Sequence, residues 1–271
     1  MLQDKISNWI KTYAKEHNRR SLVVGISGGI DSSVVSTLCA MTKMPTIAVS
    51  MPIEQLSEQH DLSIDHGNWL EGKFGNVTHE VIDLDGVYEK FWLKTFNEYG
   101  GDHAFANTKS RLRMVTLHQI SGSTKGIVVG TGNKVEDFGV GFYTKYGDGG
   151  VDISPIADLM KSEVWQLGKD LGVMQEIIDA PPTDGLWEDG RTDQDQLGGL
   201  TYEQMERAMT LDETVSGAPL DELNAIANKD DVELLDKYRQ IRKINLHKME
   251  PIPVFKNDST TQTSDSKGGS K

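Results

Sequence analysis

The sequence has a single cysteine, a shortage of positive charge and no long apolar run. Cys39 stands alone among 271 residues, which excludes a disulfide within the chain and a zinc site built on cysteines. It lies on a predicted helix and is expected to pack rather than to react. Lysine and arginine number 28 against 41 acidic residues, so the formal net charge of −13 argues against a broad nucleic-acid-binding surface. No apolar stretch is long enough to cross a membrane, and the N-terminus lacks a signal-peptide pattern. We therefore expect a cytoplasmic protein that binds neither nucleic acid nor membrane.

The remaining composition is typical of a globular α/β protein. Hydrophobic residues make up 37% and charged residues 25% of the chain, which suffices for one large core. Up to Thr131, short apolar segments alternate with helical patterns. This alternation predicts right-handed crossovers and a doubly wound parallel sheet with helices on both faces, a Rossmann-like α/β fold with extra C-terminal helices. The expected strands are 21–26, 46–50, 77–84 and 125–130, and the main expected helices are 57–73, 104–121, 161–171, 202–209, 220–228 and 232–246.

Two segments are expected to lie outside the regular elements. Residues 184–199 are polar and lack apolar periodicity, so we expect a mobile loop over the site. Residues 256–271 are rich in Ser, Thr, Asp, Lys and Gly, so we expect a disordered tail. The domain assignment is therefore 1–255 for a single domain and 256–271 for the tail.

The segment 21–41 passes from a strand to a helix across the loop 27–32, Ser-Gly-Gly-Ile-Asp-Ser. Adjacent glycines let the backbone approach a ligand, and the following helix N-terminus directs N–H groups and positive dipole at it, which predicts a phosphate site. The loop lacks the lysine of a Walker A motif and offers Asp31 instead, which suggests a bound metal ion. From these residues alone, an ordinary strand–helix turn remains the alternative. The Walker-like run 67–73 has no terminal hydroxyl and is predicted to be a helix end.

Four later stretches carry further candidate residues. Arg111 and Arg113 are two positions apart on a predicted helix, so they point to different sides and are expected to serve different partners. The run 130–137 follows a strand, where its threonine can meet a nucleotide and its glutamate a metal ion. The glycine-rich run 145–152 holds one lysine and two aspartates, and residues 247–248 are His-Lys. Taken separately, these stretches are also compatible with solvated arginines, a capped loop, a flexible loop and surface charge.

Together, the motifs resemble those of the ammonia-dependent NAD synthetases. Ser-Gly-Gly-x-Asp-Ser after a strand is similar to the loop of the N-type ATP pyrophosphatases, which cleave ATP between its α- and β-phosphates. The motifs Asn-x-x-x-Arg-x-Arg-Met, Gly-Thr with a later Glu, Lys-Tyr-Gly-Asp-Gly-Gly-x-Asp and a final His-Lys follow in the family's order. The match extends from Leu22 to Lys248. Ser110, where many relatives have a small residue, and residues 134–138 depart from the family pattern.

The resemblance implies substrates, a metal ion and a role for each matching residue. The implied substrates are deamido-NAD (nicotinate adenine dinucleotide), ATP and ammonia, and the implied assembly is a homodimer. Mg²⁺ would be bound by Asp31 and Glu136. The implied deamido-NAD contacts are Arg111, Lys145, Asp152, His247 and Lys248. The implied ATP contacts are Gly25, Ile26, Ser27, Gly28, Gly29, Ile30, Asp31, Ser32, Thr131, Lys161 and Thr183.

The implied reaction makes two demands on the site. The nicotinate carboxylate attacks the α-phosphate of ATP, giving an acyl-adenylate and pyrophosphate, so Mg²⁺, Lys161 and the loop N–H groups must reduce the repulsion between anions. Ammonia then attacks the acyl carbon, AMP leaves as NAD forms, and a carboxylate must accept a proton; our hypothesis is Asp148. Since the motifs begin at Gly25, no fused amidase domain is expected, and free ammonia or a separate partner supplies the nitrogen.

Two other functions remain open at this point. Another adenylating ATP pyrophosphatase, GMP synthetase-like or tRNA-modifying, would use a different acceptor, although the net charge opposes the tRNA branch. A nucleotide-binding sensor would bind ATP without forming AMP. Formation of AMP with deamido-NAD and ammonium, compared with xanthylate, separates the three.

Overall fold

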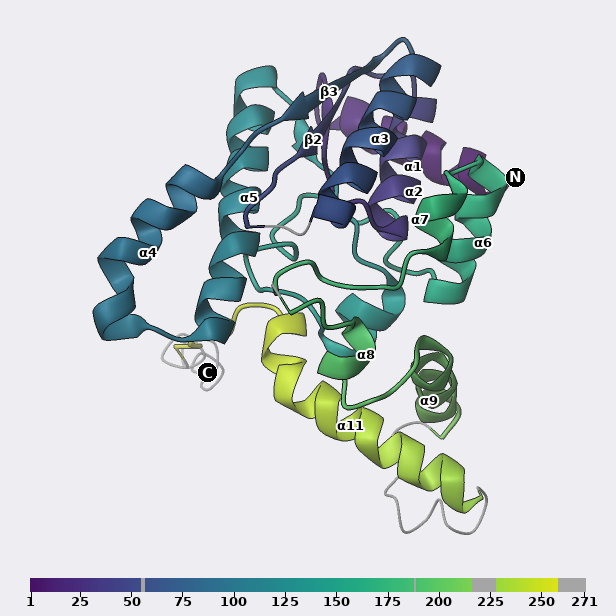
Figure 1. The fold of residues 1–271 in the computed structure, drawn as a ribbon. Helices are drawn as coiled ribbons and strands as arrows, with labels where there is room; N and C mark the ends of the chain where they lie inside the picture. Colours follow the sequence, from purple (N-terminus) through teal and green to yellow (C-terminus); the bar gives the residue numbers. More distant parts are fainter. Residues whose placement is uncertain (55–56, 188, 216–227, 258–271) are drawn as a thin grey trace, which may run out of the picture.

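A parallel sheet organises the fold of the protein (Figure 1). The computed structural model describes residues 1–54, 57–187, 189–215 and 228–257, so the expected helix at 220–228 and most of the expected disordered tail lie outside the described residues. Within the described part, four strands pair in the order β3-β2-β1-β4, and every pairing is parallel. The strands are β1 (Leu22–Ile26), β2 (Thr46–Ser50), β3 (Val77–Val81) and β4 (Ile127–Val128).

Helices alternate with these strands and then continue alone toward the C-terminus. The segment preceding β4 is α5, and the residues described after β4 form helices without further strands. The described helices are α1 (Leu2–Glu16), α2 (Ile30–Met41), α3 (Ser57–Lys73), α4 (Asp85–Tyr99), α5 (Asp102–Thr124), the π-helix η1 (Lys134–Val140), α6 (Lys161–Leu171), α7 (Gln175–Asp179), α8 (Asp193–Gln196), α9 (Tyr202–Thr214) and α11 (Lys229–Met249). None of these helices is long and apolar enough to cross a bilayer.

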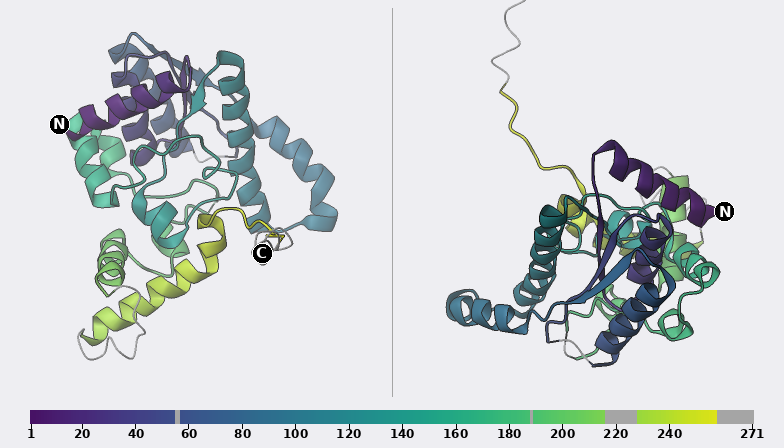
Figure 2. Two further views of the ribbon diagram at one scale, coloured as in Figure 1. Left: turned by 180° about the vertical axis from the view of Figure 1, so that it is seen from behind. Right: turned by 90° about the horizontal axis from the view of Figure 1, so that it is seen from above.

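Both faces of the sheet are covered, which confirms the doubly wound α/β prediction. Successive side chains of a strand point to opposite faces. Leu22 and Val24 accordingly pack with α1, α2 and α6, whereas Val23 packs with Met114 and Leu117 of α5. The view from above in Figure 2 shows α5 on one side of the sheet and α1 and α3 on the other. Burial on both faces explains why β1 reads as a continuous apolar run.

A third apolar cluster joins the C-terminal helices to η1. It contains Val135 and Val140 of η1, Met205 of α9, and Leu235 and Tyr238 of α11. In Figure 1, α11 runs diagonally below the sheet, and α9 lies beside the N-terminal half of α11. This cluster holds η1 against α9 and α11. It therefore also fixes the positions from which the side chains of η1 extend.

Two expected strands differ in length from those observed. The strand expected at 77–84 ends at Val81, and three residues outside regular structure lead to α4, which begins at Asp85. The strand expected at 125–130 contains only residues 127–128; Lys125 closes α5 with a φ of 55°, and Val129 instead forms a bridge with Ile153. Predictions elsewhere were closer, and α3 and α6 have the expected bounds.

Candidate functional site

The candidate site lies where the direction of the strand order reverses. From β1 the chain proceeds to β2 and β3 on one side, and β4 lies on the other side of β1. In open α/β sheets, ligands bind beyond the carboxyl ends of strands at such a point. The loops after β1 and β4 both border one cavity of about 940 Å³, together with η1, α5, α6 and the end of α11. The structure thus brings the two predicted nucleotide loops to one cavity.

The loop 27–32 has the backbone form expected of an anion site. Gly28 has a φ of 89°, which glycine adopts without the strain that a side chain would bring. Ser32 Oγ accepts a hydrogen bond from Ser27 N at 3.1 Å, and Ser27 Oγ accepts one from Gly29 N at 3.2 Å, so the loop's own hydroxyls hold its first half. Helix α2 begins after Gly29 with no side chain capping it. Its first-turn N–H groups are therefore suited to an anion in the cavity.

Lys161 lies between the two carboxylates predicted to bind metal. Its Nζ donates to Asp31 Oδ2 at 2.5 Å and to Glu136 Oε1 at 2.8 Å. The exposed fractions of the three side chains are 3% for Lys161, 17% for Asp31 and 15% for Glu136. Asn133 donates to the other oxygen of Asp31 at 3.2 Å. Three elements, α2, η1 and α6, therefore place one cation and two anions at the floor of the cavity.

The charges of this group hold one another in place. Burial disfavours the ammonium form of Lys161, but the two carboxylates outweigh it and raise the pKa of Lys161. Burial likewise works against the Glu136 carboxylate, but Lys161 and the hydroxyl of Tyr202 lower its pKa below the ordinary value. For Asp31, the effect of burial is larger than the attraction of Lys161, so the pKa of Asp31 is raised. Lys161 thus stays protonated at neutral pH.

Two further side chains complete this group, and the sequence did not reveal them. Tyr202 Oη lies 2.5 Å from Glu136 Oε1 and 2.7 Å from Asp193 Oδ2. Asp193 is only 5% exposed, and burial raises its pKa to about 7, with the Glu136 charge adding to the effect. The sequence placed Asp193 in a solvated loop. The signal for an ordered turn there is the capping box of α8, in which Thr192 and Asp195 bond each other.

Asp148, the hypothetical proton acceptor, is held by its neighbours. Its Oδ1 accepts hydrogen bonds from Ser110 Oγ at 2.7 Å and from Thr144 N at 3.0 Å. In return, Asp148 N donates to Ser110 Oγ at 2.9 Å. Burial raises the pKa of Asp148 despite these bonds. The structure also explains Ser110, a departure from the family pattern: its hydroxyl fixes the aspartate, and a Cβ on Gly147 would lie 2.2 Å from that hydroxyl.

Four of the five residues assigned to deamido-NAD line the same cavity. Arg111 Nε donates to Lys145 O at 3.3 Å, Lys145 Nζ donates to His247 O at 2.9 Å, and Lys248 Nζ donates to Tyr143 O at 2.8 Å. The exception is Asp152, which is not among the cavity residues; its Oδ2 accepts a hydrogen bond from Val128 N at 2.7 Å. The basic residues therefore converge at one end of the cavity, and a ligand role for Asp152 stays a prediction.

The two arginines of α5 serve different partners, as predicted. Arg111 contacts the glycine-rich run, whereas Arg113 Nε donates to Met51 O at 3.0 Å, after β2. Burial lowers the pKa of Arg113 to about 10, with the charges of Asp148, Asp184 and Asp85 opposing the shift. Both side chains border the cavity.

The segment formed by residues 180–187 and 189–197 borders the cavity on the side of α5 and α9. Thr183, predicted to contact ATP, lies in it, and its hydroxyl donates to Arg191 O at 3.1 Å. Trp187 stacks on His103 of α5 at 6.4 Å between ring centroids, and Arg191 lies 4.1 Å from the Trp187 ring. The segment therefore lies over the site and contacts α5 and α9. Its mobility stays a prediction.

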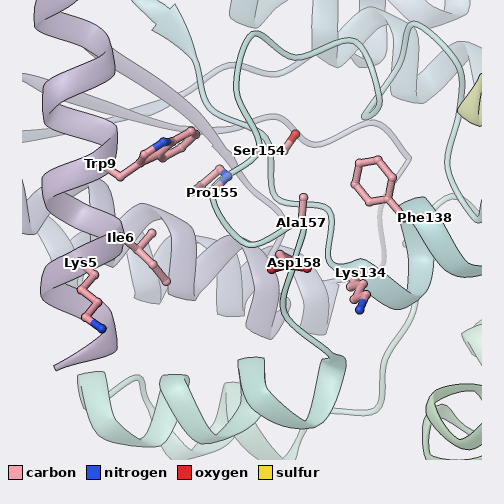
Figure 3. Close-up of a pocket in the computed structure, with 9 residues that line it drawn as sticks. All are labelled: Lys5, Ile6, Trp9, Lys134, Phe138, Ser154, Pro155, Ala157 and Asp158. Carbon is pink, nitrogen blue, oxygen red and sulfur yellow. The ribbon is translucent and has the colours of Figure 1, made fainter. Parts of the chain in front are cut away.

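A second hollow of about 600 Å³ lies between α1, η1 and residues 154–158 (Figure 3). It is more open than the first and is bordered by Ile6 and Trp9 of α1 and by Phe138 of η1. None of the predicted site residues lines it. The chemistry predicted from the sequence therefore belongs to the larger cavity.

These features define a class of protein: an α/β protein whose cavity at the reversal point of a parallel sheet suits a nucleotide's phosphates, with a buried lysine and two carboxylates beside it. Comparisons with known proteins narrow the class. The NAD synthase family model matches residues 2–251. The NH3-dependent NAD+ synthetase of Alkaliphilus metalliredigens is 38% identical over 216 residues, covering 76% of this chain and 84% of that protein.

Solved structures agree with this assignment. NMN synthetase from Francisella tularensis is 30% identical, with a TM-score of 0.78 and coverage of 93% of this chain and 96% of that chain. NH3-dependent NAD synthetase from Campylobacter jejuni has the same fold, with a TM-score of 0.74 at 23% identity and coverage of 94% and 98%. The chain belongs to the NAD synthase family.

Proposed function

We propose that this protein amidates deamido-NAD to NAD with ammonia and ATP, through an acyl-adenylate, releasing AMP and pyrophosphate. Membership of the NAD synthase family supports the reaction class. The observation that carries the proposal is the convergence of the loop 27–32, Lys161 and Asp148 on one cavity that also holds Arg111 and Lys248. One end of the cavity thus suits a triphosphate, and the other suits the phosphates of a dinucleotide.

In the first step, an oxygen of the nicotinate carboxylate bonds to the α-phosphorus of ATP and the bond to the β-phosphate oxygen breaks. Lys161 and the first-turn N–H groups of α2 stabilise the charge that moves onto pyrophosphate. Thr131 and Thr183 both border the cavity, which supports a contact of each with ATP. Because the first-turn N–H groups of α2 are held in place before ATP arrives, they lower the barrier without reorganising.

Asp31 and Glu136 suit a hard divalent cation. Both offer carboxylate oxygens to the same position, where Lys161 Nζ now lies 2.5 Å and 2.8 Å from them. Oxygen donors are those that Mg²⁺ prefers, and phosphate oxygens and water usually complete its shell. The bound ion would neutralise phosphate charge. Among the described residues, no group of three or more His, Cys, Asp or Glu side chains could hold a metal ion. The protein would therefore supply only two ligands, Asp31 and Glu136, and phosphate oxygens and water would supply the others.

In the second step, ammonia bonds to the acyl carbon, the bond to AMP breaks, and a proton passes to Asp148. The raised pKa of Asp148 makes it a better proton acceptor than an ordinary aspartate. Ser110 and Thr144 occupy Oδ1, which leaves Oδ2 for the proton. Asp148→Asn is expected to slow amide formation at least a hundredfold while acyl-adenylate still forms. The matched variant Asp179→Asn, on the exposed end of α7, is expected to behave as wild type.

The decisive experiment measures AMP with ATP, Mg²⁺, ammonium and one acceptor at a time. Deamido-NAD is expected to give AMP and NAD in equal amounts, and xanthylate to give neither. Nicotinate mononucleotide belongs in the series because a structure described as NMN synthetase is 30% identical over nearly the whole chain. Preference for the mononucleotide would contradict the dinucleotide assignment, and ATP binding without AMP would favour a sensor.

The homodimer, the single domain 1–255 and the cytoplasmic location belong to this proposal. Exposed apolar residues on α4 and α5 support a dimer, among them Leu93 at 61% and Val115 at 66% exposure. Figures 1 and 2 show α4 leaning away from the rest of the molecule, which leaves that surface open to a second copy. Sedimentation is expected to give twice the chain mass of 30.0 kDa and Leu93→Glu to give the monomer mass. A monomeric wild type would contradict the dimer.

A further inference from the structure

One hydroxyl joins a predicted metal ligand to the segment over the cavity. Tyr202 is the first residue of α9, and four residues separate it from that segment. Its Oη contacts Glu136 Oε1 at 2.5 Å on one side and Asp193 Oδ2 at 2.7 Å on the other. Glu136 belongs to η1 beside the sheet, and Asp193 begins α8 within the segment. The tyrosine is therefore a bridge between two parts of the site that the sequence separates by 57 residues.

The tyrosine ring is held from two further directions. Trp165 of α6 packs edge-to-face on it, with centroids 5.8 Å apart and planes at 87°. Lys161 Nζ lies 4.7 Å from the ring centroid, so the ring forms a wall beside the central ammonium. Because the ring cannot turn freely, the direction of its hydroxyl is set by α6 and α9 together. A rigid hydroxyl of this kind fixes the carboxylates that bond to it.

The buried carboxylate of Asp193 depends on its hydrogen bond to Tyr202. Its side chain is buried, and Oδ1 has no hydrogen-bond partner among the described residues. The side-chain bond of Asp193 to Tyr202 at 2.7 Å is therefore the tie that anchors the start of α8. The backbone N of Asp193 also donates a hydrogen bond to Pro182 O at 3.1 Å. The contact of Asp193 with Tyr202 therefore also holds the beginning of the segment.

We infer that Tyr202 is a positioning residue that couples the orientation of Glu136 to the docking of residues 180–187 and 189–197 over the cavity. A cation held by Glu136 and a docked segment then favour each other, because one rigid hydroxyl bonds to both parts. Such coupling is reciprocal: the docked segment strengthens cation binding by the factor by which the cation strengthens docking. The inference rests on the proposed function only in taking Mg²⁺·ATP as the ligand of this cavity.

The test uses Tyr202→Phe, which keeps the ring and removes the hydroxyl. The matched control is Tyr238→Phe, which removes a hydroxyl from the same apolar cluster, 3.4 Å from Gly139 O and away from the site carboxylates. Cleavage by trypsin after Arg191, within the segment, reports docking without turnover. For wild type and Tyr238→Phe, Mg²⁺·ATP is expected to slow this cleavage more than ATP with a chelator.

In Tyr202→Phe, cleavage after Arg191 is expected to be roughly tenfold faster, and Mg²⁺ to add no protection beyond that of ATP alone. In steady state, the half-saturating Mg²⁺ concentration is expected to rise roughly tenfold with kcat within about twofold of wild type. A variant that is merely less stable would lose kcat and Mg²⁺ affinity together, and would not lose the Mg²⁺ effect on cleavage.

Equal cleavage rates in Tyr202→Phe and Tyr238→Phe, or unchanged Mg²⁺ protection in Tyr202→Phe, would overturn the inference. If Tyr202→Phe does not fold, Asp193→Ala takes its place, since it removes the segment's half of the bridge and leaves the bond to Glu136. The cleavage measurement needs only ATP and Mg²⁺. A protein that makes no NAD but shows the expected cleavage pattern would therefore contradict the proposed function and leave this inference standing.

Discussion

Replacement of Lys161 by methionine tests the charge arrangement at the centre of the site. Methionine has a similar length but no charge, so Lys161→Met leaves Asp31 and Glu136 buried without their cation. Removing one partner of a buried ion pair costs about 3–5 kcal/mol, because the remaining charge keeps its desolvation penalty. Here two carboxylates lose one partner, and their exposed fractions of 17% and 15% let water compensate only in part.

We therefore expect Lys161→Met to lower the free energy of unfolding by about 3–5 kcal/mol at pH 8, without ATP or metal ions. Two companion variants make the measurement specific. Lys169→Met removes an exposed lysine from the same helix and is expected to change stability by less than about 0.5 kcal/mol. Adding Asp31→Asn and Glu136→Gln to Lys161→Met removes the stranded charges and is expected to recover at least half of the loss.

Urea unfolding followed by circular dichroism provides the assay, with equal m-values as the check on two-state behaviour. A loss below about 1 kcal/mol in Lys161→Met would refute the reasoning, since burial would then not penalise the stranded carboxylates. A triple variant no more stable than Lys161→Met would refute it as well, because the loss would then come from packing and not from charge.

Two other predictions concern the buried His66 and the glycine Gly132. His66 is fully buried, and burial lowers its pKa to about 4; the unfolded chain therefore binds the extra proton below pH 6.5, and stability is expected to fall by about 2 kcal/mol between pH 7 and pH 5. Urea unfolding of His66→Gln should lack that part of the slope, whereas His17→Gln, at an exposed position, should keep it. Gly132 faces Asp137 so closely that an added Cβ would lie 2.0 Å from Oδ2, so Gly132→Ala is expected to cost about 1–3 kcal/mol in thermal or urea unfolding. Adding Asp137→Ala should restore most of it; no recovery would show that the clash is elsewhere.

The elements nearest the phosphate loop were the easiest to predict. An unbroken apolar run, two glycines and a helical repeat follow one another within the segment 21–41, and each is a local signal. The structure has β1, the loop and α2 where these signals place them. The walls of the cavity were also predictable in large part, because motifs at the carboxyl ends of neighbouring parallel strands must meet.

The surroundings of Glu136 were not predictable in the same way. Residues 134–140 form a π-helix, a form that no local pattern in the sequence indicated. Asp193 reads as one of several acidic residues in a polar loop, and only its contact with Tyr202 shows that it is buried and bonded. The expected ends of two strands were also wrong: residues 82–84 lie outside regular structure, and Val129 forms a bridge with Ile153 instead of extending β4.

By itself, the sequence determined the α/β class, the parallel sheet and the family, because apolar periodicity, glycine positions and motif order are written along the chain. Only the tertiary structure decided that Lys161 lies between Asp31 and Glu136, and that Tyr202 joins Glu136 to Asp193. The physical reason is that charge pairing depends on distance and burial, and both are set by packing between segments far apart in the chain.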